Sequence, residues 1–96
     1  MDSVPREVIY FKAFEKELEA ISSDAKRADE SVRGAEWALC RSPRIGTRVG
    51  ADSPVWFLPL VGSTDGRSVI LYYTFNDQYV GLLSIQSIDL SEVFEL

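Results

Sequence analysis

The chain has 96 residues, of which 46% are hydrophobic and 26% are charged, and it carries a formal net charge of −5, no histidine and one cysteine. These values are typical of a single soluble globular domain spanning residues 1–96, which buries roughly 60–65% of its unfolded surface. They exclude a zinc site built from histidine and cysteine, a histidine-based catalytic triad and an internal disulfide.

The sequence shows no pattern of a membrane-spanning or secreted protein. No run reaches the roughly 18 apolar residues of a transmembrane helix, and the first stretch, MDSVPREVIYF, lacks the basic region and long apolar core of a secretory signal. The thiol of Cys40 is expected to be buried and structural in a reducing compartment. We therefore expect a cytoplasmic protein without membrane contact, and no pattern predicts a cofactor or a metal ion.

Charge is distributed unevenly along the chain. Nine of the ten basic residues lie at or before Arg48, where nine acidic residues balance them. After Arg48 the chain has Arg67 alone against six acidic residues. Since proteins that bind nucleic acid usually present a basic face, such a face would have to come from the first half.

Residues 12–41 have the periodicity of amphipathic helix, and they follow a short β-prone run, Glu7–Phe11. One face carries an apolar stripe at steps of three and four: Phe14, Leu18, Ile21, Ala25, Ala28, Val32, Ala35 and Leu39. A single helix would be about 45 Å long, against a radius of gyration of about 13 Å for a domain of this size. Ser22-Ser23-Asp24 offers helix-capping side chains, so we predict an antiparallel pair of helices over residues 12–22 and 24–41. One long helix is the alternative, because the stripe keeps its phase.

Three smaller features accompany these elements. Gly34 weakens the second helix by about 1 kcal/mol relative to alanine, which a close helix–sheet contact or simple tolerance would explain. Gly62–Arg67 is predicted as a turn between strands. The tail Asp89–Leu96 is compatible with a short helix, an extension of a strand or a partner-binding segment.

The second half is predicted to form an antiparallel sheet. Ser42-Pro43 ends the helix, and a loop follows to residue 50. Val55–Val61 is predicted as a strand in which Pro59 cannot donate to a ladder, so this strand lies at an edge or carries a bulge. Two β-branched and aromatic runs, Val69–Phe75 and Tyr79–Ile88, flank a polar turn and predict a β-hairpin. The fold class is therefore α+β, with two N-terminal helices packed on a mainly antiparallel sheet of three or four strands.

The order of these elements resembles a known family. The segments LCRSPRIGTRV, VWFLPL and VILYYTFNDQYVGLLSI are similar to the Pro-x-x-Gly loop, the middle strand and the closing hairpin of the RelE/ParE superfamily of bacterial toxins. The resemblance spans Glu7 to Ile88 and implies the toxin of a type II toxin–antitoxin system, which binds a macromolecular target and is neutralised by a cognate antitoxin.

The resemblance also indicates what the chain lacks. RelE-type members cut messenger RNA on the ribosome, which requires cations beside the scissile phosphate and a group that deprotonates the 2′-hydroxyl. The family's basic residues on the strands and after them fall near Trp56, Leu58, Ile70 and Leu90 of this chain, and none of these is basic. RelE-like ribonuclease activity is therefore disfavoured, and whether the protein is an enzyme at all stays open.

Candidate site residues follow from residue type. Arg41, Arg44 and Arg48 form a basic run suited to a phosphate or an acidic partner, although a solvated loop is the favoured alternative. Arg67 and one of Tyr72 and Tyr73 are weak catalytic candidates, because a tyrosine with a pKa near 10 needs cationic neighbours to act as a base. Adjacent strand residues face opposite sides of a sheet, so one tyrosine is expected in the core.

Several functions remain open at this point. The ribosome with its messenger RNA and DNA gyrase are the target classes of the family, and gyrase poisoning needs no hydrolytic residues. The alternatives are a non-catalytic, non-toxic interaction module with the same fold and a residual messenger RNA endoribonuclease that uses Arg44, Arg48, Arg67 and a tyrosine. A homodimer is also compatible with the sequence.

Overall fold

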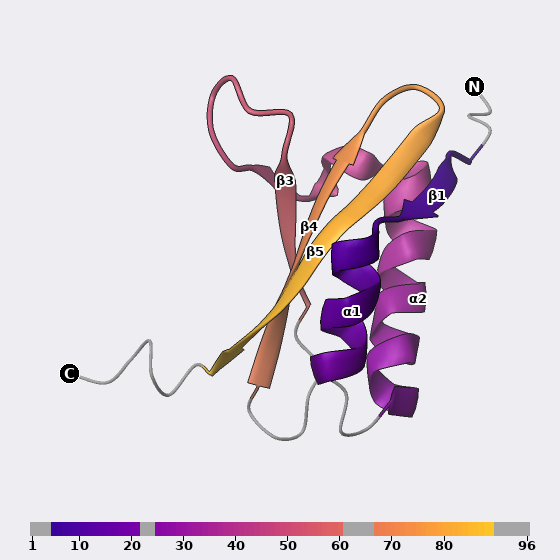
Figure 1. Cartoon of the computed structure of the whole chain (residues 1–96). Coiled ribbons are helices and arrows are strands. Elements are labelled where there is room, and N and C mark those ends of the chain that lie inside the picture. Colours follow the sequence, from indigo (N-terminus) through magenta and orange to yellow (C-terminus); the bar gives the residue numbers. More distant parts are fainter. Residues whose placement is uncertain (1–4, 22–24, 61–66, 90–96) are drawn as a thin grey trace.

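The computed structural model describes residues 5–21, 25–60 and 67–89, which form two helices against one sheet (Figure 1). In chain order the elements are β1 (Glu7–Tyr10), α1 (Lys12–Ile21), α2 (Ala25–Arg41), the 3-10 turn η1 (Pro43–Ile45), β2 (Thr47–Arg48), β3 (Trp56–Leu60), β4 (Arg67–Phe75) and β5 (Tyr79–Asp89). No helix in these ranges is long and apolar enough to cross a membrane.

The sheet has five strands in the order β1-β5-β4-β3-β2. β3, β4 and β5 form the predicted antiparallel meander, and β1 joins β5 in parallel. The prediction of three or four strands was therefore wrong. The additional strand is β2, where Thr47 and Arg48 pair with Phe57 and Trp56 inside the stretch predicted as a loop. A two-residue strand is too short to leave a periodic pattern in a sequence.

The closing hairpin was predicted correctly. Its turn is held by Asn76, whose side-chain Oδ1 accepts hydrogen bonds from the backbone N–H groups of Gln78 and Tyr79, both at 2.8 Å. This is the self-capping that makes asparagine frequent in turns. The hairpin is irregular at one place, because Tyr72 pairs with Ser84 while Tyr73 pairs with Leu82, which leaves Leu83 as an extra residue in β5.

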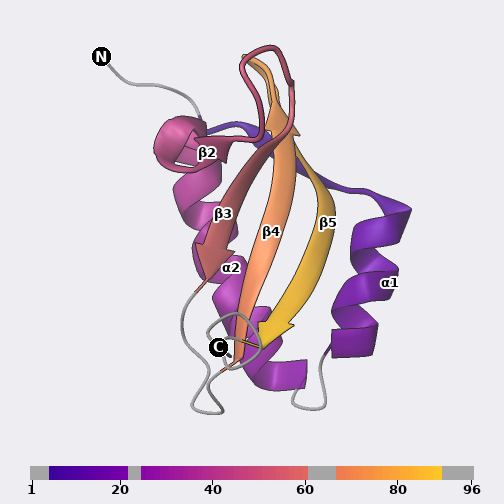
Figure 2. The ribbon, with the colours of Figure 1, turned by 90° about the vertical axis from the view of Figure 1, so that its left-hand side faces the viewer.

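Both helices lie on one side of the sheet and run in opposite directions (Figures 1 and 2). The bounds agree with the two predicted helices, and the predicted cap at residues 22–24 lies outside the described residues. α1 lies along β5 beyond the point where β1 ends (Figure 2). There the Ser84 hydroxyl donates to the Glu17 carboxylate at 2.9 Å, so α1 covers an edge that β1 leaves open.

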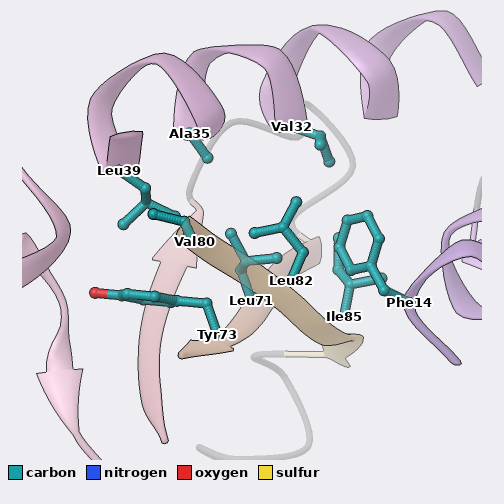
Figure 3. Close-up of a cluster of buried hydrophobic side chains, with 9 residues drawn as sticks. All are labelled: Phe14, Val32, Ala35, Leu39, Leu71, Tyr73, Val80, Leu82 and Ile85. Atoms are coloured by element: carbon teal, nitrogen blue, oxygen red, sulfur yellow. The ribbon is translucent and has the colours of Figure 1, made fainter. Parts of the chain in front are cut away.

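The core fills the space between the helices and the sheet (Figure 3). It contains one residue of α1, three of α2 and five of the hairpin: Phe14, Val32, Ala35, Leu39, Leu71, Tyr73, Val80, Leu82 and Ile85. Leu82 and Ile85 are three positions apart and still share a face, because the extra residue Leu83 shifts the strand alternation. The predicted apolar stripe is thus the face that α1 and α2 bury, as far as their side chains are described.

Three smaller predictions are decided by the structure. The strand with Pro59 was predicted at an edge or with a bulge; β3 lies between β4 and β2, but β2 extends only along Trp56 and Phe57, so Pro59 has no partner on that side among the described strands. Gly34 is exposed, and a Cβ added there would have nothing within 4 Å. No close helix–sheet contact requires this glycine, so the helix simply tolerates it. Cys40 is a free, buried thiol as predicted. The predicted turn Gly62–Arg67 and the predicted tail Asp89–Leu96 lie outside the described residues except for Arg67 and Asp89, which belong to β4 and β5.

Candidate functional site

The segment after α2 is held against the sheet by a single side chain. The Tyr73 hydroxyl donates to the Pro43 carbonyl at 2.5 Å and accepts from the Gly46 N–H at 3.2 Å. Its ring belongs to the core while its oxygen points away from the other core side chains (Figure 3). Residue 46 is a glycine because a Cβ there would lie 2.5 Å from the Phe57 carbonyl oxygen and closer still to the Tyr73 hydroxyl. Tyr73 therefore fixes η1 and the start of β2.

Two aromatic rings of the sheet lie in contact beside this segment. Phe75, at the end of β4, and Trp56, at the start of β3, have ring centroids 5.3 Å apart at a tilt of 60°. The Tyr73 ring stacks on Phe75 with a centroid separation of 6.3 Å. Both Phe75 and Trp56 pack against the core and keep part of their surface exposed. They form a firm apolar platform at one end of the sheet.

Three arginines from separate segments lie over these rings. The guanidinium carbons of Arg6 and Arg44 are 5.9 and 5.6 Å from the Phe75 ring centroid, and that of Arg48 is 5.4 Å from the Trp56 centroid. These distances are within the range of cation–π attraction. We call Arg6, Arg44, Arg48, Phe75 and Trp56 the arginine–aromatic cluster. Its residues come from five segments, so the fold has to form before the cluster exists.

Backbone carbonyls fix two of the three arginines. The Arg6 Nε donates to the Asn76 carbonyl at 2.6 Å, and the Arg48 Nη1 donates to the Ala51 carbonyl at 3.0 Å. The backbone N–H of Arg6 also donates to the Cys40 carbonyl at 2.9 Å, which attaches the start of β1 to the last turn of α2.

The structure divides the predicted basic run. Arg44 and Arg48 belong to the cluster, whereas Arg41 stacks on Trp37 of α2 at 4.3 Å and donates to the Trp37 carbonyl at 3.0 Å. Arg6 was missed by the sequence analysis. It stands 70 positions before its partner Asn76, and only the parallel pairing of β1 with β5 brings the two together. A basic residue just before a predicted strand does not indicate in the sequence which other strand will pair beside it.

The catalytic candidates do not form one site. Tyr73 is fully buried, and burial raises the pKa of its hydroxyl while the Gly46 N–H offsets part of that rise. Tyr72 lies on the other face of the sheet, with its ring 6.4 Å from that of Phe57. Arg67 begins β4 and pairs with Asp89, at the end of the strand opposite to Phe75. The predicted separation of the two tyrosines onto opposite faces is thus confirmed.

The positions at which the sequence resemblance places the family's basic residues are apolar here. Trp56 and Leu58 pack against the core from β3, and Ile70 pairs with Pro59 within the sheet. Leu90 lies outside the described residues. Among the side chains that are described, no three His, Cys, Asp or Glu residues group as metal ligands. What this end of the sheet offers is a set of positioned guanidinium groups, suited to an anion.

Comparisons with known proteins identify the fold. No protein-family model and no curated protein matches the sequence. Among solved structures, the chain is similar to a chain of the toxin–antitoxin complex RelBE2 from Mycobacterium tuberculosis, with 18% identity and a TM-score of 0.69 over 92% of this chain and 97% of that one. It is also similar to a mutant of the Escherichia coli toxin RelE in the free state, with 17% identity and a TM-score of 0.68 over 95% of this chain and 92% of that one. At such identities the likeness shows the fold alone, and this fold is the RelE-like toxin fold that the sequence resembles.

Proposed function

We propose that this protein, which has the RelE-like toxin fold, is the toxin of a type II toxin–antitoxin pair and arrests growth by binding a macromolecular target without cutting RNA. The observation that supports the proposal most is the extent of the likeness. More than nine-tenths of the chain superposes on more than nine-tenths of two solved chains, one a RelE toxin and one from a toxin–antitoxin complex. No additional element in the described ranges suggests a different use of the scaffold.

The arrangement of side chains supports binding over RNA cleavage. Cleavage needs cations and a proton acceptor gathered around one phosphate. Here Arg67 is at one end of β4 and the arginine–aromatic cluster is at the other. The hydroxyl of the buried Tyr73 is already hydrogen-bonded to the Pro43 carbonyl and the Gly46 N–H. A residual endoribonuclease built from Arg44, Arg48, Arg67 and a tyrosine would need groups that the fold keeps apart.

A neutralising antitoxin would need an apolar surface, and β1 offers one. Ile9, Phe11 and Tyr79 are 38–46% exposed and share the face of the sheet away from the helices, where the Phe11 ring lies over Gly81. Adjoining apolar side chains that remain exposed are typical of a protein-binding surface. An antitoxin helix or strand laid across this corner would cover them.

The test is titratable expression of the full chain in bacteria, with growth, transcript integrity and the DNA-damage response followed together. The proposal predicts growth arrest with intact transcripts, and relief of the arrest when a small acidic protein encoded beside the gene is co-expressed. Leu71→Asp, which places a carboxylate at a fully buried core position, provides the unfolded control.

Other outcomes select other functions. Arrest accompanied by transcript cleavage would contradict the proposal and identify a ribonuclease. Arrest with a DNA-damage response would place the target at DNA gyrase and agree with the proposal. Unimpaired growth at high soluble expression would exclude a toxin and leave a non-toxic interaction module.

A further inference from the structure

The arginine–aromatic cluster has more hydrogen-bond donors than protein acceptors. Each guanidinium has five N–H donors in a fixed planar fork. Arg6 uses its Nε and Arg48 its Nη1, whereas Arg44 makes no hydrogen bond to the atoms that the structure describes. None of the three forms an ion pair within the described ranges. The donors that remain are suited to an anion that approaches this end of the sheet.

The rings and carbonyls also prepare the cluster for binding. Arg6 is held by Asn76 and Phe75, and Arg48 is held by Ala51 and Trp56, so both long side chains are already ordered. An anion that binds here therefore causes a smaller loss of side-chain entropy than it would on free arginines. Carboxylate and phosphate both fit the guanidinium fork.

The surroundings favour a single carboxylate over a polyanion. Glu7, Asp52 and Asp77 are exposed and lie next to or close to the cluster residues in the chain, and the whole protein has a net charge of −5. A nucleic acid strand would bring phosphates against these acids as well as against the arginines. Ile45 and Val49, which directly follow Arg44 and Arg48, are 50% and 52% exposed and offer apolar contacts beside the charges.

We infer that the arginine–aromatic cluster binds a peptide segment in which one acidic side chain is flanked by apolar ones. The acidic side chain accepts hydrogen bonds from guanidinium groups of the cluster, of which Arg44 has all its donors free of described protein acceptors, and its apolar neighbours contact Ile45 and Val49. The inference rests on the proposed function only in assigning this segment to the macromolecular target of the toxin. Binding itself requires neither.

The test measures binding to immobilised nonapeptides in pairs, with a central Glu or a central Gln and flanks drawn from Leu, Val, Ile, Phe, Ser and Gly. The 96-residue protein should prefer Glu peptides with apolar flanks, about tenfold over their Gln counterparts, because charge-assisted hydrogen bonds are the stronger kind. R6A/R44A/R48A should lose this preference, and R44K should lose part of it because lysine lacks the planar fork. R33A removes an exposed arginine of α2 outside the cluster and should bind as the wild type does.

Three results would overturn the inference. They are equal binding of the Glu and Gln peptides, an unchanged preference in the triple variant, and a 20-nucleotide single-stranded RNA that binds more tightly and displaces the peptides. The circular dichroism spectrum of each variant shows that loss of binding is not loss of folding. Peptide binding without growth arrest would contradict the toxin proposal and leave this inference standing. Growth arrest without peptide binding would contradict this inference and leave the toxin proposal standing.

Discussion

Tyr73 connects the stability of the core to the geometry of the candidate site. Its ring fills the space between β4 and the helices, and its hydroxyl holds the two backbone groups that shape the segment after α2. Tyr73 therefore fixes the backbone of the segment that carries Arg44 and Arg48. The adjacent Tyr72 does neither, because it faces the other side of the sheet.

Replacing Tyr73 by Phe should lower the free energy of unfolding by about 1–3 kcal/mol, because the Pro43 carbonyl and the Gly46 N–H lose their partner. Urea unfolding followed by circular dichroism measures this. Tyr72→Phe is the matched control and should cost less than about 0.5 kcal/mol, in the range of substitutions away from such networks. Equal losses at the two positions would contradict the anchoring role of Tyr73.

Glu36 of α2 should make stability depend on pH. Burial raises the pKa of its carboxyl from the ordinary value of 4.5, and one of its oxygens, Oε1, is buried without a hydrogen-bond partner among the described atoms. The folded state thus holds this proton more tightly than the unfolded chain does. The contribution to stability is fully present below pH 4.5 and is lost as the pH rises through the raised pKa.

Glu36→Gln should therefore be more stable than the wild type at pH 7, and the difference should disappear towards pH 4. Urea unfolding at intervals between these pH values gives both curves. Glu19→Gln, at an exposed position of α1, controls for the loss of one negative charge. Parallel curves for Glu36→Gln and the wild type would show that Glu36 is not the group responsible.

Among the elements, the long and periodic ones could be predicted and the short ones could not. The amphipathic stripe gave both helices, and the two β-branched runs around Asn76 gave the hairpin to within two residues. β2 and the extra residue Leu83 leave no periodic trace, because their pairing depends on strands brought together from elsewhere in the chain. Only part of the cluster could be predicted for the same reason, because Arg44 and Arg48 are four positions apart in the sequence, whereas Arg6 directly precedes β1 and reaches the cluster only through the pairing of β1 with β5.

Gly34 and Gly46 test two different effects of replacing a glycine, a gain in helix propensity and a steric clash. Gly34→Ala should stabilise the protein by about 0.5–1 kcal/mol, because alanine favours the helix and nothing lies near the new methyl group. Gly46→Ala should destabilise it, because the methyl group would push against the Phe57 carbonyl and the Tyr73 hydroxyl. Thermal unfolding of both variants gives the signs, and a stabilising Gly46→Ala would show that β2 can shift freely.

At the scale of the whole molecule, the chain combines a RelE-like fold with an arginine–aromatic cluster at one end of its sheet. Trp56 and Leu58 pack against the core, and positive charge is gathered over Phe75 and Trp56 by Arg44 of η1, Arg48 of β2 and Arg6, which directly precedes β1. The sequence could not predict the complete cluster, because Arg6 reaches it only through the order of the strands.

The measurement that tests this account most directly is the growth rate of bacteria after induction of the wild type, R6A/R44A/R48A and R33A at equal soluble levels. We predict arrest by the wild type and R33A, with intact transcripts, and growth with the triple variant, because the cluster provides the positive charge that meets the target. Arrest by the triple variant equal to that by the wild type, or transcript cleavage during arrest, would contradict the account.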